Sequence, residues 1–358
     1  MTNLWKVSAF PLILCGIAAN GAAANIVDMG AMTNAAAVNN NGVAVGYSFG
    51  GGTTVPFVYE NGSVVPLLVS AGTRFNGLAI STSGIVVGSG VPTGATYAQP
   101  MEYNGSATPL GTLPGGVSGA AFGINIHDDV VGYSSTATSN QHAFKYDAAL
   151  QQMQDLGTLG GDLSWAMGIN ASGQVVGSAV DASGTQLAFL YDGTMQSLGS
   201  LGPGFSEAAA INDSGVVVGD YYTGSAIHAF RWDGTMHDLG TLGDDSVATS
   251  INSAGQIAGF YHGGGSARAF LYANGAMIDL NTLLPANSGW DLEEAYGIND
   301  SGLVVGIGGK DGTIHGFLLD ASGAAAPEPG TWALLLAGLA VGCRNLRPAR
   351  GVGRRVED

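Results

Sequence analysis

The chain has 358 residues, of which 59 are glycine, 46% are hydrophobic and only 11% are charged. Because glycine costs about 1 kcal/mol against alanine inside a helix, this composition disfavours helices and favours short strands joined by tight turns. Residues 25–326 carry five basic residues against 24 acids, a net charge of −19. Such an acidic body cannot neutralise phosphates, so we expect no nucleic-acid partner.

The N-terminus predicts export. Lys6 precedes an apolar run over residues 7–19 and then the small residues 22–24. A basic start, a short apolar region and a small-residue cleavage site are typical of a signal peptide, here residues 1–24, which signal peptidase would remove. Lipoprotein processing at Cys15 is the alternative, although Leu14 stands where a small residue is expected.

The body between residues 25 and 320 is built from one repeating unit. Its period is about 40 to 47 residues, which is typical of propellers and solenoids. The period is counted between the glycines that end each Val-Val-Gly-like run: Gly46, Gly88, Gly132, Gly177, Gly219, Gly259 and Gly306.

Each unit contains four predicted strands. The first is small and apolar and ends in Ile-Asn (166–170), and an Asn-x-Ser-Gly turn (212–215) follows it. The second is rich in β-branched residues (216–222) and the third carries aromatic residues (228–232). An Asp-Gly or Asn-Gly hairpin turn then leads to the fourth strand, which is 236–242 in one unit and 278–283 in the next. Residues 160–164, with Asp162 among them, are expected to form a loop that crosses between blades. Four antiparallel strands per unit predict one propeller blade.

The two ends of the body decide between a closed ring and a stacked solenoid. The seventh unit ends at Leu319 without a fourth strand, while residues 26–32 resemble an isolated fourth strand. A stacked array would gain nothing from this permutation, whereas a ring closed by it has no unpaired end blades. We therefore predict an all-β fold, a seven-bladed β-propeller whose N-terminal strand completes the last blade.

The repeat resembles the HAF-repeat family of probable extracellular bacterial proteins. The His-Ala-Phe triplet stands at 142–144 and 228–230, and related triplets follow the same glycine runs elsewhere. The first two units depart most, with Ser81 in place of the asparagine and with 56–59 and 100–103 in place of the triplet. The resemblance implies an extracellular address but no particular activity.

The C-terminus has three parts. An alanine-rich linker (321–326) leads to Pro327-Glu328-Pro329, an apolar run follows over 331–343, and arginines begin at Arg344 and Arg347. Thirteen helical residues span about 20 Å, less than the roughly 30 Å hydrocarbon core, so the run suits transient insertion into the inner membrane better than permanent anchoring. An ordinary tail anchor is the alternative.

This tail, residues 327–358, resembles the PEP-CTERM sorting signal. The resemblance implies recognition of Pro327-Glu328-Pro329 and the arginine cluster by an exosortase of a Gram-negative bacterium. It also implies cleavage near the Pro-Glu-Pro motif and delivery to the extracellular space or outer cell surface. The tail after Arg347 is longer than is usual for the family.

The residues offer little catalytic chemistry. His142, His228 and His315 occupy one repeat position on different units, so they are not expected to converge on a metal, and a hydrogen bond at the start of the strand explains them better. Both cysteines lie outside the body, no loop has calcium-binding spacing, and no nucleophile or phosphate-binding motif occurs. We expect no cofactor, with an isolated calcium ion as the weak alternative.

Trp165 and Trp290 are the candidate ligand-binding residues, because an exposed indole can stack on a sugar ring. Packing between blades is the alternative for each. We therefore expect a non-enzymatic, exported propeller that binds or scaffolds extracellular matrix or polysaccharide. The alternative is a propeller glycoside hydrolase or lyase that acts on such a polysaccharide, with its carboxylates drawn from different blades.

Overall fold

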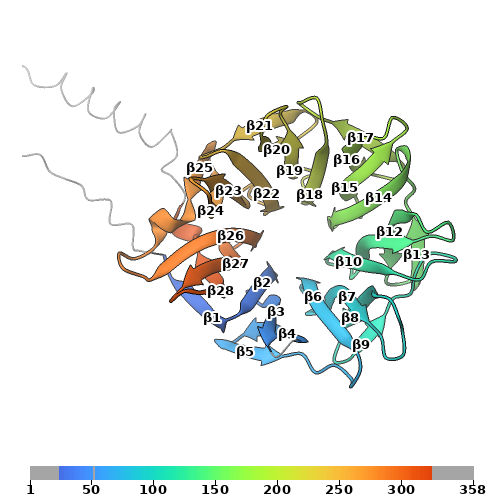
Figure 1. Ribbon diagram of the computed structural model, residues 1–358, viewed down its shortest axis with the longest axis horizontal. Coiled ribbons are helices and arrows are strands. Elements are labelled where there is room, and N and C mark those ends of the chain that lie inside the picture. The colour runs from blue at the N-terminus through green and yellow to red at the C-terminus, as the bar shows by residue number, and fades with distance from the viewer. Residues whose placement is uncertain (1–23, 51–52, 325–358) are drawn as a thin grey trace, which may run out of the picture.

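The computed structural model describes residues 24–50 and 53–324, which form a ring of seven four-stranded antiparallel sheets (Figure 1). This confirms the predicted seven-bladed β-propeller. The predicted cleavage site apart from Ala24, the Pro-Glu-Pro motif, the apolar run 331–343 and both cysteines lie outside the described residues. Within the described residues, no helix is long and apolar enough to cross a membrane.

The strands are numbered from the innermost to the outermost in blades 1 to 6. Blade 1 has β2 (Thr33–Val38), β3 (Ala44–Gly50), β4 (Thr53–Glu60) and β5 (Ser63–Pro66). Blade 2 has β6 (Arg74–Ile80), β7 (Val86–Val91), β8 (Gln99–Tyr103) and β9 (Ala107–Pro109). Blade 3 has β10 (Gly119–Ile124), β11 (Val130–Ser135), β12 (Gln141–Asp147) and β13 (Gln152–Asp155).

The next three blades repeat this order. Blade 4 has β14 (Gly160–Ile169), β15 (Val175–Asp181), β16 (Gln186–Tyr191) and β17 (Met195–Gly199). Blade 5 has β18 (Ser206–Ile211), β19 (Val217–Tyr222), β20 (Ile227–Trp232) and β21 (Met236–Gly240). Blade 6 has β22 (Asp245–Ile251), β23 (Ile257–Gly263), β24 (Ser266–Ala273) and β25 (Ala276–Asp279), followed by the 3-10 helix η1 (Leu280–Leu283).

Blade 7 joins the two ends of the propeller. It has β26 (Trp290–Ile298), β27 (Leu303–Lys310) and β28 (Thr313–Asp320), and its outermost strand is β1 (Ile26–Ala31). In β1, Ile26 lies opposite Leu319 and Asp28 lies opposite Phe317. Figure 1 shows blue β1 beside red β28, as the sequence predicts.

The glycine of each Val-Val-Gly run is required by a β-bulge in the innermost strand. At Gly219, an added Cβ would overlap the backbone carbonyl of Glu207 on the neighbouring strand β18. The equivalent glycine of every other blade meets the equivalent carbonyl. One step further along the inner strand the register shifts, as between Ala208 and Ala210, and the bulge turns one extra residue toward the central channel.

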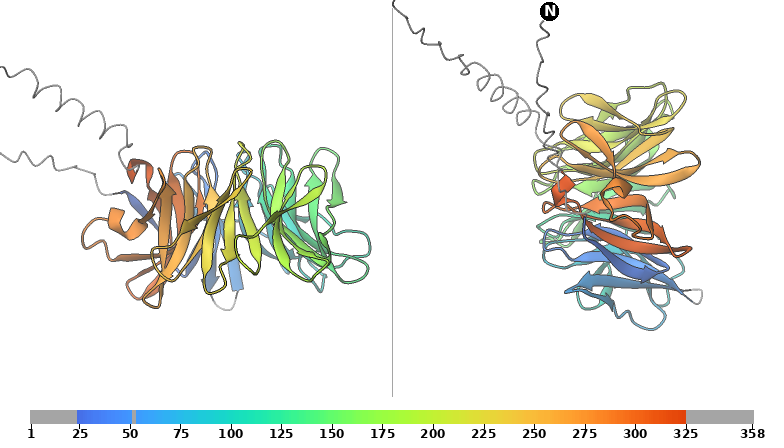
Figure 2. Two further views of the ribbon diagram at one scale, coloured as in Figure 1. Left: turned by 90° about the horizontal axis from the view of Figure 1, so that it is seen from above. Right: turned by 90° about the vertical axis from the view of Figure 1, so that its left-hand side faces the viewer.

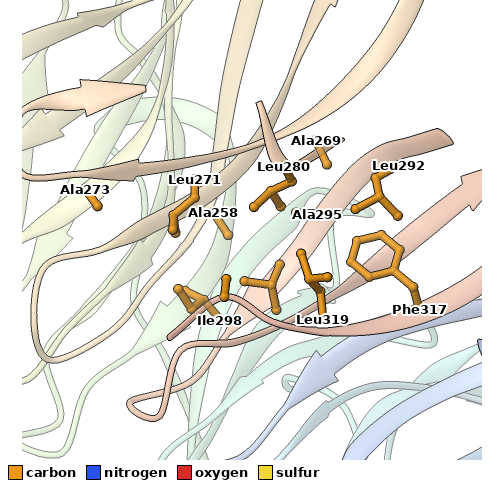
Figure 3. Close-up of a cluster of buried hydrophobic side chains, with 12 residues drawn as sticks. Ala258, Ala269, Leu271, Ala273, Leu280, Leu292, Ala295, Ile298, Phe317 and Leu319 are labelled. Atoms are coloured by element: carbon orange, nitrogen blue, oxygen red, sulfur yellow. The ribbon is translucent and has the colours of Figure 1, made fainter. Parts of the chain in front are cut away.

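The hydrophobic core lies in the seams, a term used here for the boundaries between neighbouring blades. There are seven clusters of buried side chains among the described residues, one for each seam. Figure 3 shows the cluster between blades 6 and 7, where Leu271 and Leu280 pack against Leu319 and Phe317. The aromatic residue of the His-Ala-Phe triplet is fully buried because it fills this space in each blade that has it.

The strands run between two faces of the ring, which Figure 2 shows from the side. We call the face where the innermost strands begin the open face and the face where they end the asparagine face. Two predicted boundaries were wrong: residues 160–164, expected to cross between blades, belong to β14, and the predicted strand 278–283 ends at Asp279, where η1 follows. Asp162 therefore lies in a strand and not in a loop.

Candidate ligand site in the central channel

A ring of asparagine side chains closes the channel at the asparagine face. Each amide donates to the backbone carbonyl of the equivalent residue in the next blade, as from Asn212 Nδ2 to Asn252 O at 3.1 Å. Asn299 Nδ2 donates to Asn39 O at 2.9 Å and so links the last blade to the first. Six such bonds are present, and the seventh is missing because Ser81 has no amide to offer Asn125.

The same asparagines shape the predicted turns. Asn212 Oδ1 accepts hydrogen bonds from Ser214 N and Val216 N, and Gly215 takes the positive φ of 79°. These bonds satisfy backbone groups that lie next to a buried side chain. The asparagines are therefore structural, because each amide connects two blades while its oxygen shapes a turn.

An apolar collar lies directly inside the asparagine ring. It separates a small cavity of about 230 Å³ at the asparagine face from a larger one of about 720 Å³ that opens toward the open face. The collar consists of the last residue of each innermost strand: Val38, Ile80, Ile124, Ile169, Ile211, Ile251 and Ile298.

The larger cavity is the candidate ligand site. All seven bulge residues line it, and they are the variable part of the repeat: Ala36, Leu78, Phe122, Met167, Ala209, Thr249 and Tyr296. Asn34, Tyr47, Glu207 and Asp220 add polar groups from the inner and second strands. A cavity of this size with aromatic walls and a few polar groups is typical of small-ligand sites.

Two carboxylates face each other in blade 5. Glu207 on β18 and Asp220 on β19 are opposite one another in the ladder, and Gln186 Nε2 of blade 4 donates to Glu207 Oε1 at 2.6 Å. Burial raises the pKa of Asp220 to about 7, and the charge of Glu207 adds to this. Burial also raises the pKa of Glu207, while the bond from Gln186 lowers it. Asp220 is therefore about half protonated at pH 7, beside a second buried acid.

A second cluster of polar residues lies in blades 7 and 1. Tyr296 donates its hydroxyl proton to Glu294 Oε2 at 2.8 Å. Burial and this bond raise the pKa of Tyr296 well above its ordinary value, so the phenol stays neutral. Burial likewise raises the pKa of Tyr47. The site thus offers neutral phenols on one side and a titratable acid pair on another.

Trp165 and Trp290 are placed apart from one another and outside the lining of this cavity. Trp165 is half-buried in β14, and its Nε1 donates to Gln141 Oε1 at 2.8 Å. Trp290, at the start of β26, packs edge-on against His315 and Phe317, and Lys310 Nζ lies 5.2 Å from its ring centre. Both stay predicted ligand-binding residues, but Trp290 also packs within its blade.

The repeated histidines pair with the outermost strand of their own blade. His142 lies 2.9 Å from Asp155 and His228 lies 3.1 Å from Asp238. His315 Nδ1 lies 2.8 Å from Asp28, across the closing strand pair. Arg268 replaces histidine in blade 6 and pairs with Asp279. The expected hydrogen bond is therefore present. Among the described residues, no group of three or more His, Cys, Asp or Glu could hold a metal.

Comparisons with known proteins show the fold alone. No protein-family model matches the chain, and no curated protein matches it. Among solved structures, the β-propeller domain of the trilobed protease from Pyrococcus furiosus is similar with a TM-score of 0.54 and 10% identity, over 84% of this chain and 94% of that one. Its ring has an open velcro topology, whereas β1 closes the ring here.

Two further solved structures are similar with lower scores. TolB from Acinetobacter baumannii has a TM-score of 0.46 and 13% identity over 74% of this chain. A puromycin-hydrolysing peptidase from Mycobacterium tuberculosis has a TM-score of 0.47 and 11% identity, also over 74%. The chain spans 59% of the first and 50% of the second.

Glu207, Asp220, Tyr47 and Tyr296 were missed as site residues by sequence reasoning. Asp220 and Tyr47 follow the repeated glycine, Glu207 lies opposite Asp220 on the inner strand, and Tyr296 is the bulge residue of its blade. The side chains at these three repeat positions change from blade to blade, and that variation is the sequence signal that could have found them.

Proposed function

We propose that this protein binds extracellular polysaccharide, without cleaving it, through the cavity at the open face. The supporting observation is the cavity of about 720 Å³, which is lined by aromatic side chains together with carboxylate, amide and hydroxyl groups. Sugars present apolar C–H faces and hydroxyl edges, so they match walls of mixed aromatic and hydrogen-bonding character.

Binding is tested on a glycan array with purified protein. We expect Tyr47→Ala and Glu207→Gln each to weaken binding about tenfold or more, because each removes a direct contact in the cavity. Tyr97→Ala is the matched control, since Tyr97 is 57% exposed and does not line the cavity. Equal losses in all three variants, or no binding by the wild type, would refute the proposal.

The alternative is a glycoside hydrolase or lyase, and the pair Glu207 and Asp220 is the observation that favours it. An acid with a pKa of about 7 beside a second carboxylate is a usable proton donor at neutral pH. Release of reducing or unsaturated ends from purified exopolysaccharide would measure turnover. Turnover that Asp220→Asn abolishes would replace the binding proposal with the enzymatic one.

The proposal includes the cellular location of the protein, outside the cell or on its outer surface. Its support is the signal-peptide pattern of residues 1–24 and the PEP-CTERM-like tail with Pro327-Glu328-Pro329, Arg344 and Arg347. Signal peptidase and an exosortase would act on a transiently inserted precursor in a Gram-negative bacterium. Mass spectrometry of the secreted protein tests this, because a mature C-terminus beyond Arg344 would contradict processing at the sorting signal.

A further inference from the structure

A second cavity lies on the open face in the seam between blades 1 and 2. It measures about 490 Å³, separate from the channel cavity. Phe49, Val69 and Val91 form apolar parts of its wall, and fully buried Phe75 lies among its lining residues. Phe49 is 46% exposed, so its ring is accessible to a ligand.

Arg74 lines this groove and is the one basic side chain without an acidic partner among the described residues. The other four basic side chains of the body each lie within ion-pair distance of an aspartate. Most of the 24 acids of the body lie in other blades, and blades 1 and 2 contain only Glu60 and Glu102. The groove is therefore a local positive site on an acidic protein.

Two further donors line the same groove. Asn76 Oδ1 accepts a hydrogen bond from Thr54 at 2.7 Å, which orients the amide, and no described residue accepts from its Nδ2. Ser89 lies opposite Asn76 in the ladder and adds a hydroxyl group. Guanidinium, amide and hydroxyl donors beside an exposed aromatic ring suit a ligand that is both anionic and partly apolar.

The groove adjoins the candidate site in the channel. Tyr47 lines the channel cavity and Phe49 lines the groove, and their rings meet edge-on with centres 5.2 Å apart. A chain-like ligand that occupies the channel mouth can therefore continue past Tyr47 into the groove.

We infer that this groove binds a carboxylate-bearing sugar unit of the polysaccharide, a uronate, with its carboxylate on Arg74 and its apolar face on Phe49. The inference rests on the proposed function and adds a chemical class to it. A densely charged polyanion would be repelled by the net charge of −19, so the fit is to a largely neutral chain with spaced carboxylates.

The test compares two probes that differ only in the carboxylate. One is a tetrasaccharide with a single glucuronate among three neutral hexoses, and the other is the same tetrasaccharide with the glucuronate reduced to glucose. Calorimetry should show at least tenfold tighter binding of the acidic form to the wild-type protein, because charge-assisted hydrogen bonds contribute about twice as much as neutral ones. Arg74→Gln should abolish this preference and leave binding of the reduced form unchanged.

Arg231→Gln is the matched control, since it removes the same charge from an exposed, already paired side chain on blade 5. This variant should keep the preference for the acidic tetrasaccharide over the reduced one. Equal binding of both probes to the wild type would overturn the uronate subsite while leaving the proposed function standing. Failure of both probes to bind would overturn both. Tight binding of acetyl-trileucine with a free carboxylate, in place of either sugar, would assign the groove to a peptide C-terminus.

Discussion

The seams on the two sides of blade 2 are built differently from most of the ring. In four seams a buried hydroxyl bridges two blades: Ser206 Oγ accepts from Ala188 N at 2.9 Å and donates to Gly199 O at 2.6 Å. Ser164, Ser246 and Thr33 make the same pair of bonds in their seams.

Two of the three remaining seams have lost donor and acceptor together. Between blades 1 and 2, Pro56 has no N–H to donate and Phe75 replaces the serine. Between blades 2 and 3, Pro100 faces Gly119, where an added Cβ would lie 3.1 Å from the proline ring. These seams are apolar, and the first of them contains the groove with Arg74.

The same contrast holds at the open face. Glu207 and Asp220 of blade 5 occupy the ladder positions that Asn76 and Ser89 occupy in blade 2. One unit thus presents a pair of acids with raised pKa values where another presents neutral donors next to an arginine. These differences show that the same backbone fold can carry different side-chain chemistry at the positions where the repeat does not fix the residue type.

The two largest expected effects lie in the seams, and the first is loss of a bridging hydroxyl. Ser206→Ala leaves Ala188 N and Gly199 O buried without partners, and we expect a loss of about 3 kcal/mol in the free energy of unfolding, measured with urea. Ser214→Ala, at an exposed turn position, should change it by less than about 0.5 kcal/mol. A similar small change in both would mean that the bridge contributes little.

The proline seam gives the complementary experiment. Phe75→Ser should cost about 4 kcal/mol, because a large buried ring is removed and the new hydroxyl faces a proline without an N–H. Adding Pro56→Ala supplies that donor, so the double variant should regain about 1 kcal/mol. A double variant less stable than Phe75→Ser would show that the bridge cannot be transferred to this seam.

The acid pair predicts a pH dependence in blade 5 that blade 2 lacks. The pKa of Asp220 is about 7 in the folded protein and about 4 when unfolded, so the native state binds more protons between these values. The stability should therefore fall as the pH rises from about 4 to 7, by about 2 kcal/mol after solvent screening. Asp220→Asn should remove this slope in urea unfolding at a series of pH values.

Asp162→Asn serves as the control for charge, because Asp162 is exposed and lies in blade 4. It should retain the wild-type slope. A flat wild-type curve between pH 4 and 7 would contradict the raised pKa.

The closing strand of blade 7 has an ion pair that blades 1 and 2 lack. Burial alone would raise the pKa of Asp28, but bonds from Lys310, His315 and Gly30 N lower it to about 2. Its stabilisation is present above pH 4 and is lost as the pH falls toward 2. We expect this contribution to the free energy of unfolding to be about 1 kcal/mol, since the Asp28 side chain is 30% exposed. Asp28→Asn should remove the fall in stability between pH 4 and pH 2, measured by urea unfolding. Asp311→Asn, at an exposed turn, should keep the acid-dependent loss of stability.

The smallest expected effect is a gain in blade 2. Ser81→Asn supplies the amide that the asparagine ring lacks there and should stabilise the fold by about 0.5–1 kcal/mol through a bond to Asn125 O. Ser81→Asp has a similar shape but donates no proton from its carboxylate, so it should not stabilise. Equal effects of the two substitutions on the thermal midpoint would mean that the gap in the ring has no energetic consequence.

The repeat could be recognised from the sequence because its local signals all predict the same fold. Seven blades are predicted by the spacing of the glycines and by the Asn-x-Ser-Gly turns. The closure of the ring is predicted by the isolated fourth strand at residues 26–32. The limits of β14 and the helix η1 were missed because strand ends depend on pairing with the neighbouring strand, which outweighs local preference.

The candidate site could not be predicted in the same way. Glu207 and Asp220 are 13 positions apart in the sequence, and Tyr47 and Tyr296 lie at opposite ends of the chain. A bulge turns one residue of each inner strand toward the channel, and no residue pattern along a single strand marks that change of side.

Taken by itself, the sequence determined the class of fold, the number of units and the closure, since these depend on periodicity and on the order of the repeated segments. The cellular address stays a prediction from the terminal segments. Only the tertiary structure decided which side chains share a space, because seven distant strands meet around one channel. The acid pair, the gap at Ser81 and an Arg74 without an acidic partner among the described residues arise from that convergence.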